Sequence, residues 1–380
     1  MLDLRSSVRV AARRPVFHVK HRLGLLAAAL AVLVLTACGQ LASPEGWAGP
    51  VAEGDLVLAQ LDRGTLSAGS FASSGTFNER WRFPAESDDL DLGAIYATPL
   101  IDGGVVYVVS FDGNATALNL ETGRPVWSAL ARVDGHVVST PILQNGRLFV
   151  PTGSGEVVVL NAEDGSVAAR YFEQNGRIWA APVASAGAVY VGKFDDRAVV
   201  ALSASSGEAL WEVDLDGAVS SDLVLGGGLL LAGSLDHVLY ALDVDAQGRE
   251  VWAFRTDGWI VAAPVVAGDR VYVATLRGSV YAVDLATGTE DWRFEEAGLE
   301  FRSRPVLLGG ILVVADRDGR LRGLNPATGT LEWQSNLEGT DLFADPIVLN
   351  GEIVYLTKSG ELLRVTPSDG AVARVPELEA

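Results

Sequence analysis

The sequence predicts an all-β fold, an eight-bladed β-propeller of four-stranded antiparallel blades. Three observations predict it: a repeat of about 41 residues, short β-type segments separated by glycine turns, and a tryptophan at a fixed place in most repeats. Repeats of roughly 40–45 residues with several short strands are typical of propeller blades. Propellers carry their functions in loops, so this repeat predicts the fold more directly than the activity.

Prolines mark the start of each repeat. Seven of the eight positions hold a proline, and we place Asp222 in the position without one: Pro50, Pro99, Pro141, Pro182, Asp222, Pro264, Pro305 and Pro346. A proline at the start of a strand removes no essential ladder hydrogen bond. The eight units predict one propeller domain over residues 47–378. Because a ring must close, we expect residues 41–51 to complete or seal the weak eighth blade.

One unit illustrates the expected strands. Residues 263–266, 271–274 and 280–283 are rich in valine and tyrosine, and a fourth segment begins at Trp292. Such β-branched and aromatic residues favour strands. Gly268, Gly278 and Gly288 separate the segments, and glycine supplies the positive φ that tight hairpin turns need. Each unit is therefore expected to fold as a meander of four strands.

A tryptophan follows the last turn glycine by four residues in five units. These residues are Trp127, Trp211, Trp252, Trp292 and Trp333. A large aromatic ring on an outer strand can bury much of its surface against the neighbouring blade. We predict that these five residues dock successive blades. Ala169 takes this position in the third unit, which is therefore expected to be the least tightly docked, and Arg374 takes it in the last.

The turn and its tryptophan also carry a family resemblance. The segment Ala282-Val-Asp284-Leu-Ala-Thr287-Gly288-Thr-Glu-Asp-Trp292 resembles the tryptophan-docking motif of pyrroloquinoline quinone (PQQ)-type propeller repeats. The resemblance covers seven of the eight units and implies the same propeller fold. The motif is specific for this fold and says little about activity.

The first 37 residues predict a secretory signal peptide. Six lysines and arginines precede an apolar run over residues 23–35, which is too short for a comfortable membrane-spanning helix. The run ends in Leu35-Thr36-Ala37-Cys38, which resembles the lipobox of bacterial lipoproteins and implies lipidation of Cys38. Residues 38–46 would then form a linker. An uncleaved membrane anchor and twin-arginine export through Arg13-Arg14 stay open as alternatives.

The charge of the chain limits its partners. Removing residues 1–37 takes six basic and one acidic residue from totals of 29 and 48, which leaves 23 against 47 and a net charge of −24. Nucleic-acid binding depends on lysine and arginine at phosphates, so this balance argues against it. Adsorption to an anionic membrane surface is disfavoured for the same reason. We expect an extracytoplasmic protein held by its lipid, on the periplasmic face of an outer membrane or, without one, on the outer face of the cytoplasmic membrane.

The sequence offers no catalytic or metal-binding constellation. The chain after Cys38 has two histidines, His136 and His237, in separate repeats, which disfavours a zinc site or a Ser-His-Asp triad. Quinoprotein alcohol dehydrogenases resemble the chain in blade motif, but that family clamps PQQ with a vicinal cysteine pair. Cys38 is the only cysteine here. We therefore predict a protein without catalytic residues, metal or cofactor, and keep a PQQ enzyme as a minor alternative.

A lipid-anchored, acidic and non-catalytic propeller resembles the BamB family of the outer-membrane β-barrel assembly machinery. This resemblance implies an interaction scaffold, a monomer within a complex, whose partner is the barrel-inserting subunit. The family's contact loops lie just ahead of the inner-strand proline. Their nearest matches here are Leu299-Glu-Phe301-Arg302 and Asp341, where Phe343 replaces a second aspartate.

The loops before the repeat positions are the predicted partner-binding face. Three residues before each position stand Tyr96, Val138, Trp179, Val219, Val261, Arg302 and Phe343. Aromatic residues and arginine dominate interface hot spots, so we predict a partner-binding face made of Tyr96, Trp179, Trp259, Arg302, Asp341 and Phe343. Two alternatives remain for these residues: packing of the channel top, and binding of a small molecule or glycan at the channel mouth.

Overall fold

The computed structural model describes residues 48–62, 64–72, 74–85, 92–171, 176–185 and 187–375. These residues all belong to one compact unit. The predicted signal peptide (residues 1–37), Cys38 and the predicted linker (38–46) lie outside the described residues. No helix in the described ranges is long and apolar enough to cross a membrane.

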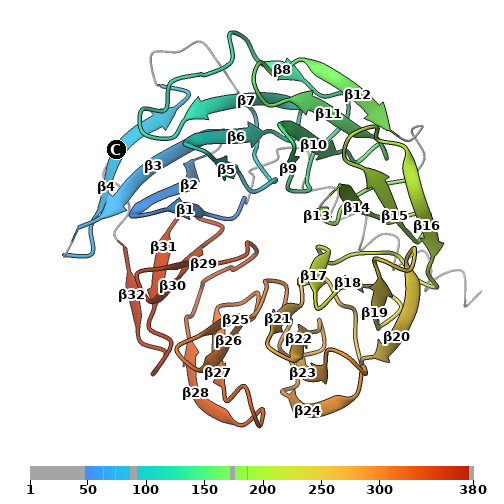
Figure 1. Ribbon diagram of the computed structural model, residues 1–380. Helices are drawn as coiled ribbons and strands as arrows, with labels where there is room; N and C mark the ends of the chain where they lie inside the picture. The colour runs from blue at the N-terminus through green and yellow to red at the C-terminus, as the bar shows by residue number, and fades with distance from the viewer. Residues whose placement is uncertain are drawn as a thin grey trace, which may run out of the picture. The chain divides into compact units, whose positions relative to one another are not determined.

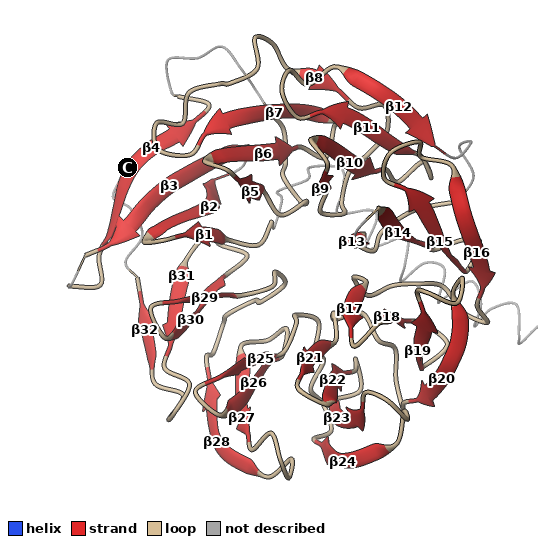
Figure 2. Cartoon of the chain, in the orientation of Figure 1, coloured by secondary structure: helices blue, strands red, loops and turns tan. Residues whose placement is uncertain are grey.

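The described residues form eight four-stranded antiparallel sheets, which confirms the predicted propeller (Figures 1 and 2). The first blade comprises β1 (Val51–Glu53), β2 (Leu56–Asp62), β3 (Thr65–Phe71) and β4 (Phe77–Phe83). The second comprises β5 (Leu100–Asp102), β6 (Val105–Val109), β7 (Asn114–Asn119) and β8 (Ala131–Arg132). The third comprises β9 (Ile142–Gln144), β10 (Arg147–Pro151), β11 (Val157–Asn161) and β12 (Val167–Tyr171). The fourth comprises β13 (Val183–Ser185), β14 (Ala188–Lys193), β15 (Ala198–Ser203) and β16 (Ala209–Asp214).

The second half of the ring repeats this pattern. The fifth blade comprises β17 (Val224–Gly226), β18 (Leu229–Gly233), β19 (Val238–Asp243) and β20 (Arg249–Arg255). The sixth comprises β21 (Val265–Ala267), β22 (Arg270–Ala274), β23 (Ser279–Asp284) and β24 (Glu290–Glu295). The seventh comprises β25 (Val306–Leu308), β26 (Ile311–Ala315), β27 (Arg320–Leu324) and β28 (Leu331–Asn336). The eighth comprises β29 (Ile347–Leu349), β30 (Glu352–Leu356), β31 (Leu362–Val365) and β32 (Val372–Arg374).

Each sheet consists of four strands that are consecutive in the chain, which corrects the first half of our expectation for ring closure, that residues 41–51 complete the eighth blade. The described part of that range does lie against this blade, since Gly49 borders Asp345 in the loop before β29, and residues 41–47 lie outside the described residues. Strand β1 pairs with β2 of its own blade, through Val51 opposite Leu58, and does not complete the eighth sheet. The first and last blades nevertheless lie side by side, as the blue and red ends of the ribbon show (Figure 1). Apolar side chains from both blades, including Val57 and Val354, form the joint that closes the ring.

The hydrophobic core is divided into eight layers, and each layer lies between two successive blades. In the first layer, Trp81 of the first blade packs with Val106 and Leu118 of the second. The second and third strands of the blades are almost completely buried. Burial of apolar surface is the main favourable term in folding, so the joints between blades carry most of the stability.

Aromatic rings lie across seven of the eight joints. Each ring covers a turn glycine of the next blade: Trp81 covers Gly123, Trp127 Gly165, Tyr171 Gly207, Trp211 Gly248, Trp252 Gly288, Trp292 Gly329 and Trp333 Gly370. These glycines have φ between 66° and 75°. A Cβ atom on any of them would lie 1.5–2.7 Å from the ring. The turns therefore need glycine both for its backbone conformation and for the close approach of the ring.

The tryptophans differ in how deeply they are buried. Trp127, Trp252 and Trp292 are buried, and their indole N–H groups donate to backbone carbonyls of the next blade at 2.9–3.0 Å. Trp211 and Trp333 are partly exposed, although both pack against their joints.

The third blade is docked by a tyrosine that the sequence analysis missed. Tyr171, two residues after Ala169, covers Gly207 and donates its hydroxyl to the Ser206 carbonyl at 3.1 Å. Strand β12 pairs with β11 through an irregular register, which lies next to Ala169. Tyr171 therefore takes the place of the missing tryptophan in the joint between the third and fourth blades.

The structure also shifts the fifth repeat by one residue. Strand β17 begins at Val224, directly after Leu223, as β21 begins at Val265 directly after Pro264. Leu223 therefore takes the proline position, and Asp222 corresponds to the residue before it. Because leucine keeps its N–H group, Leu223 donates to the Ala181 carbonyl at 3.1 Å, a bond that proline cannot make.

Candidate partner-binding mouth and central cavity

Two sets of loop residues form the mouth of the propeller. We call the first set the cavity ring, which comprises the residues three before each repeat position: Tyr96, Val138, Trp179, Ser220, Val261, Arg302 and Phe343. All of them except Ser220 line a central cavity of about 150 Å³. The second set, the rim, lies two residues earlier in each loop: Ala94, His136, Arg177, Ala218, Trp259, Glu300 and Asp341.

Backbone hydrogen bonds hold the rim in an equivalent place in the second to eighth blades. Each rim carbonyl accepts an N–H bond from the turn between the second and third strands of its blade. Examples are Leu276 to Trp259 at 3.0 Å and Lys358 to Asp341 at 3.0 Å.

The six predicted partner-binding residues divide between these two sets. Tyr96, Trp179, Arg302 and Phe343 line the cavity, and Tyr96 is buried there with 7% of its surface exposed. The other two, Trp259 and Asp341, are exposed on the rim, with 41% of the Trp259 surface accessible. The structure therefore brings the six residues to one mouth without forming one continuous cluster.

Three other residues named in the sequence analysis are buried. Val219 is fully buried in the joint between the fourth and fifth blades. Ser220 occupies the cavity-ring position that the sequence analysis had assigned to Val219. Leu299 and Phe301 are 2% and 0% exposed in the joint between the sixth and seventh blades. These two side chains form part of the core and are not available to a partner.

Arg177 forms a cation–π stack at the mouth of the fourth blade. Its guanidinium carbon lies 4.6 Å from the ring centroid of Trp179 and 4.9 Å from that of Phe194. Asp195 accepts from both its Nε and Nη2 atoms, at 3.0 and 2.6 Å. The same arginine amide donates to Asp195 at 2.8 Å, so the stack is fixed from both sides.

A second aromatic stack lies at the mouth of the second and third blades. The imidazole of His136 is parallel to the Phe111 ring, with centroids 4.3 Å apart. Phe111 in turn meets Tyr96 edge to face, with centroids 5.3 Å apart. Such geometries are favourable for aromatic pairs, and they give this side of the mouth a firm aromatic surface.

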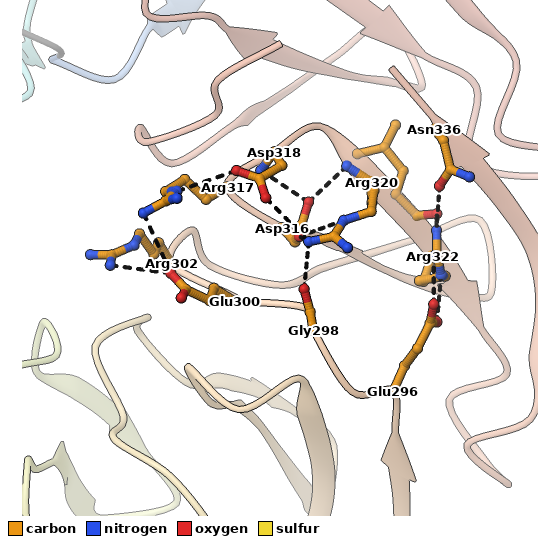
Figure 3. A network of polar contacts seen from close by, with 11 residues as sticks. Glu296, Gly298, Glu300, Arg302, Asp316, Arg317, Asp318, Arg320, Arg322 and Asn336 are labelled. Carbon is orange, nitrogen blue, oxygen red and sulfur yellow. Dashed lines mark hydrogen bonds and ion pairs between the residues drawn. The ribbon is translucent and has the colours of Figure 1, made fainter. Parts of the chain in front are cut away.

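The opposite side of the mouth is charged, as Figure 3 shows. Glu300 accepts from Arg302 at 3.4 Å and lies 3.6 Å from the Nη1 atom of Arg317. Behind them, fully buried Asp316 accepts from the Arg320 Nε atom at 2.8 Å. Arg320 also donates to the Gly298 carbonyl at 2.6 Å, which ties the loop before β25 to the start of β27.

A partly buried ion pair supports the same loop (Figure 3). Glu296 accepts two bonds of 2.7 Å from Arg322, whose side chain is only 4% exposed. Arg322 also donates to the Asn336 side chain at 3.0 Å. Paired in this way, the carboxylate is stabilised in its charged form, and the arginine bonds hold the pKa of Glu296 below its usual value. The loop that carries Arg302 is therefore held in place before any partner binds.

A belt of hydrogen bonds surrounds the cavity one residue before the proline position. In four blades the backbone amide donates to a side chain of the next blade. The bonds run from Gly49 to Thr98 at 3.2 Å, Thr98 to Thr140 at 3.3 Å, Ala181 to Asp222 at 2.7 Å and Arg304 to Asp345 at 2.7 Å. The sequence analysis overlooked this role, although threonine and aspartate recur at this position at steps of about 41 residues.

Asp222 and Asp345 give the cavity its negative charge. Removal from bulk water, together with the charge of Asp345, raises the pKa of Asp222 from 3.8 to about 6. The same desolvation raises the pKa of Asp345, and the Arg304 guanidinium and amide oppose this rise. An acid whose ionised form is disfavoured at its site destabilises the fold at neutral pH.

Replacing Asp222 with asparagine should therefore raise the free energy of unfolding at pH 7.5 by about 1–2 kcal/mol. The full shift of about two pKa units corresponds to about 3 kcal/mol, and water in the open cavity reduces it. Asparagine keeps an acceptor for the Ala181 amide. Because the folded-state pKa is raised, the carboxyl favours folding below about pH 4 and loses this contribution as the pH rises through about 6. The gain should accordingly disappear at pH 4.

Urea unfolding of both proteins at pH 7.5 and pH 4 measures this difference. The exposed rim residue Asp341, changed to asparagine, is the control and should alter stability by less than about 0.5 kcal/mol. An Asp222→Asn protein that is no more stable than the wild type at pH 7.5 would show that the cavity does not disfavour the ionised form of Asp222.

A family model described as outer membrane protein assembly factor BamB matches the chain over residues 36–197, 172–246 and 195–372. Together these stretches cover all eight blades. A comparison with curated proteins found no match.

Solved structures show the same fold. BamB from Moraxella catarrhalis has a TM-score of 0.69 and 21% identity, over 82% of this chain and 94% of its own. The computationally designed protein Ika8 has a TM-score of 0.70 and 15% identity, over 88% and 98%. A europium-containing methanol dehydrogenase has a TM-score of 0.70 and 12% identity, over 84% and 82%. At these identities the likeness concerns the fold alone.

Proposed function

This chain belongs to the family of the outer membrane protein assembly factor BamB, and from that membership we propose that it is a non-catalytic, lipid-anchored scaffold of the cell envelope. Its partner in this proposal is a subunit of a β-barrel assembly complex, which docks on the mouth of the propeller. The observation that carries the proposal is the fixed arrangement of exposed aromatic and charged residues around the mouth. Preorganised aromatic and arginine side chains are the usual anchors of protein interfaces.

The two sides of the mouth suggest how such a partner would bind. Trp259 is a large exposed apolar side chain, and single anchors of this kind contribute most when a partner buries them completely. Arg302 and Glu300 on the charged side would set the orientation of the partner, because charged groups at an interface contribute mainly to specificity and association rate. The proposed contact surface therefore includes both the rim and the accessible part of the cavity ring.

Truncating Arg302 to alanine should weaken capture of the assembly subunit by about 2 kcal/mol, or roughly 30-fold in the dissociation constant. The reason is that Arg302 borders both the cavity and the rim and is held in place by the network of Figure 3. Affinity purification from solubilised envelopes, with quantification of β-barrel assembly subunits, measures the change.

Arg249→Ala is the matched control. Its side chain is 72% exposed at the start of β20, and it pairs with Asp243 rather than with a mouth residue. The control should retain full capture. Equal capture by wild type and Arg302→Ala, with unchanged thermal unfolding, would place the contact surface elsewhere.

The lipid anchor at Cys38 is part of the same proposal. Cys38→Ala should leave an unprocessed precursor, because no other cysteine can accept the lipid. The lipid-anchored form of the protein should then be missing from the membrane fraction. Membrane fractionation with immunoblotting measures both effects. Since Gly39 follows the cysteine, we expect sorting to the outer membrane in a bacterium that has one. A wild-type protein recovered wholly in the soluble fraction would reject the anchor.

The likeness to a methanol dehydrogenase does not extend this proposal to quinone chemistry. PQQ carries three carboxylates, and the cavity at the centre of the ring presents Asp222 and Asp345. Like charges in a partly desolvated site repel, so the residues present do not suit this cofactor. The proposed role is accordingly that of a binding protein.

A further inference from the structure

The central cavity combines carboxylates with aromatic rings. Asp222 and Asp345 contribute the carboxylates, and Tyr96, Trp179 and Phe343 contribute the rings. The volume of about 150 Å³ is sufficient for a small group of a few heavy atoms. Aromatic faces are electron-rich and attract cations, and carboxylates strengthen that attraction.

The charge of Asp222 is only partly balanced within the protein. Among the described contacts, its carboxylate accepts one hydrogen bond, from the Ala181 amide at 2.7 Å, and forms no ion pair. Asp345 differs, because the Arg304 amide donates to it at 2.7 Å and the Arg304 guanidinium lies 4.0 Å away. Arg302 borders the cavity; its Nη2 group donates to Glu300 at 3.4 Å, and its buried Nε group has no hydrogen-bond partner within the described structure. Arg304 also acts electrostatically on Asp222, but it is the partner of Asp345, so the two carboxylates at the cavity share one arginine and the pair keeps a net negative charge.

Two buried hydroxyl groups near the cavity also lack partners. The Tyr355 hydroxyl and the Ser303 hydroxyl belong to side chains of residues only 1% and 2% exposed, and neither has a hydrogen bond within the described structure. Ser303 follows the lining residue Arg302, and Tyr355 lies close enough to Asp345 for that charge to raise its pKa. Each oxygen has lone pairs that could accept an N–H bond, and buried polar groups without partners are uncommon.

We propose that the central cavity binds a primary alkylammonium group, presented by a free amine or by a lysine side chain of a docked protein. The ammonium would lie against Asp222, with its alkyl chain between the aromatic rings. An anion is disfavoured by the carboxylates, and a neutral alcohol or sugar would leave the charge of Asp222 unbalanced. The free-amine source is independent of the proposed docking function, whereas the lysine source rests on it.

Calorimetric titration of the full-length protein in mild detergent tests this proposal. The probes are n-butylammonium and N-acetyl-lysine methylamide, with n-butanol and methyl glucoside as neutral controls. We expect saturable binding of butylammonium at pH 7.5 and at least tenfold weaker binding of both neutral probes. Tighter binding of the lysine derivative would indicate a docked lysine, and tighter binding of butylammonium would indicate a free amine.

Asp222→Asn should weaken butylammonium binding at least tenfold, whereas Asp245→Asn, a change of an exposed aspartate in the turn between β19 and β20, should bind like the wild type. Thermal unfolding controls for folding, because Asp222→Asn is expected to melt no lower than the wild type. The charged groups that face Asp222 are Asp345 and Arg304. Because Asp222 takes up its proton near pH 6, the dissociation constant should rise about tenfold between pH 7.5 and pH 5.0.

Three results would overturn the proposal: no binding of either amine up to 50 mM, equal binding of butanol or the glucoside, or unchanged binding in Asp222→Asn. Failure of the amine titrations with intact capture of the assembly subunit would reject this inference alone. If Arg302→Ala loses capture of the assembly subunit and the wild type binds neither amine, the docking proposal is supported and the proposal of amine binding in the cavity is rejected.

Discussion

Replacing Trp292 with alanine is expected to lower the free energy of unfolding by about 3–5 kcal/mol, the usual cost of removing a buried aromatic side chain. Trp292 is 8% exposed and packs with Leu312 and Leu324 of the next blade. Its indole N–H donates to the Pro326 carbonyl at 3.0 Å, so the substitution leaves both a cavity and an unpaired carbonyl. The substitution would therefore weaken the joint between the sixth and seventh blades.

Equilibrium unfolding in urea, followed by circular dichroism, measures this loss. Trp259→Ala is the matched control, since Trp259 is 41% exposed on the rim and contributes little to a joint. Its removal should change stability by less than about 1 kcal/mol. Similar effects of the two substitutions would mean that the tryptophans do not dock the blades.

Replacing Gly329 with alanine should cost about 3 kcal/mol or more. Its φ of 73° is unfavourable for an L-residue by about 1–2 kcal/mol. A Cβ atom would also lie 2.4 Å from the Trp292 ring, and overpacking of this kind typically costs about 1–3 kcal/mol. The two costs add because they act on different parts of the structure, the backbone of the turn and the ring above it.

Gly309→Ala separates the two costs. Gly309 has a similar φ of 61°, but a Cβ atom there would meet nothing within 4 Å. It should therefore show only the backbone cost, about 1–2 kcal/mol. In the double variant Trp292→Ala with Gly329→Ala, removal of the ring frees the space, so the combined loss should be smaller than the sum. Strict additivity would contradict contact between the two residues.

The fold could be predicted from the sequence because its determinants are local. A turn glycine and a tryptophan four residues later, as in Gly288 and Trp292, define both a hairpin and the ring that docks the blade. The prediction was wrong where it depended on residue identity rather than register. Asp222 was placed in the proline position, whereas the strand starts show Leu223 there. Tyr171 was missed because its joint uses a different residue two positions later.

The site was harder to predict because it depends on side chains from many blades meeting at one axis. Sequence spacing identified Arg302 and Phe343 as mouth residues. It could not show that Trp259 and Asp341 would lie on the rim, or that Leu299 and Phe301 would be buried. The charge of the cavity could not be predicted from the sequence either, since Asp222 and Asp345 are 123 residues apart and interact only after the ring has closed.

Because every sheet within residues 48–375 is made of four consecutive strands, no blade described there borrows a strand from the far end of the chain. The chain could therefore be cut in any connection between blades and joined across the closing joint, and all eight sheets would remain whole. Circular permutation would move the termini around the ring without dividing a β-sheet. The same modularity lets such a protein gain or lose a blade as one duplicated or deleted segment, so ring size can change by unequal recombination rather than by redesign of the strands.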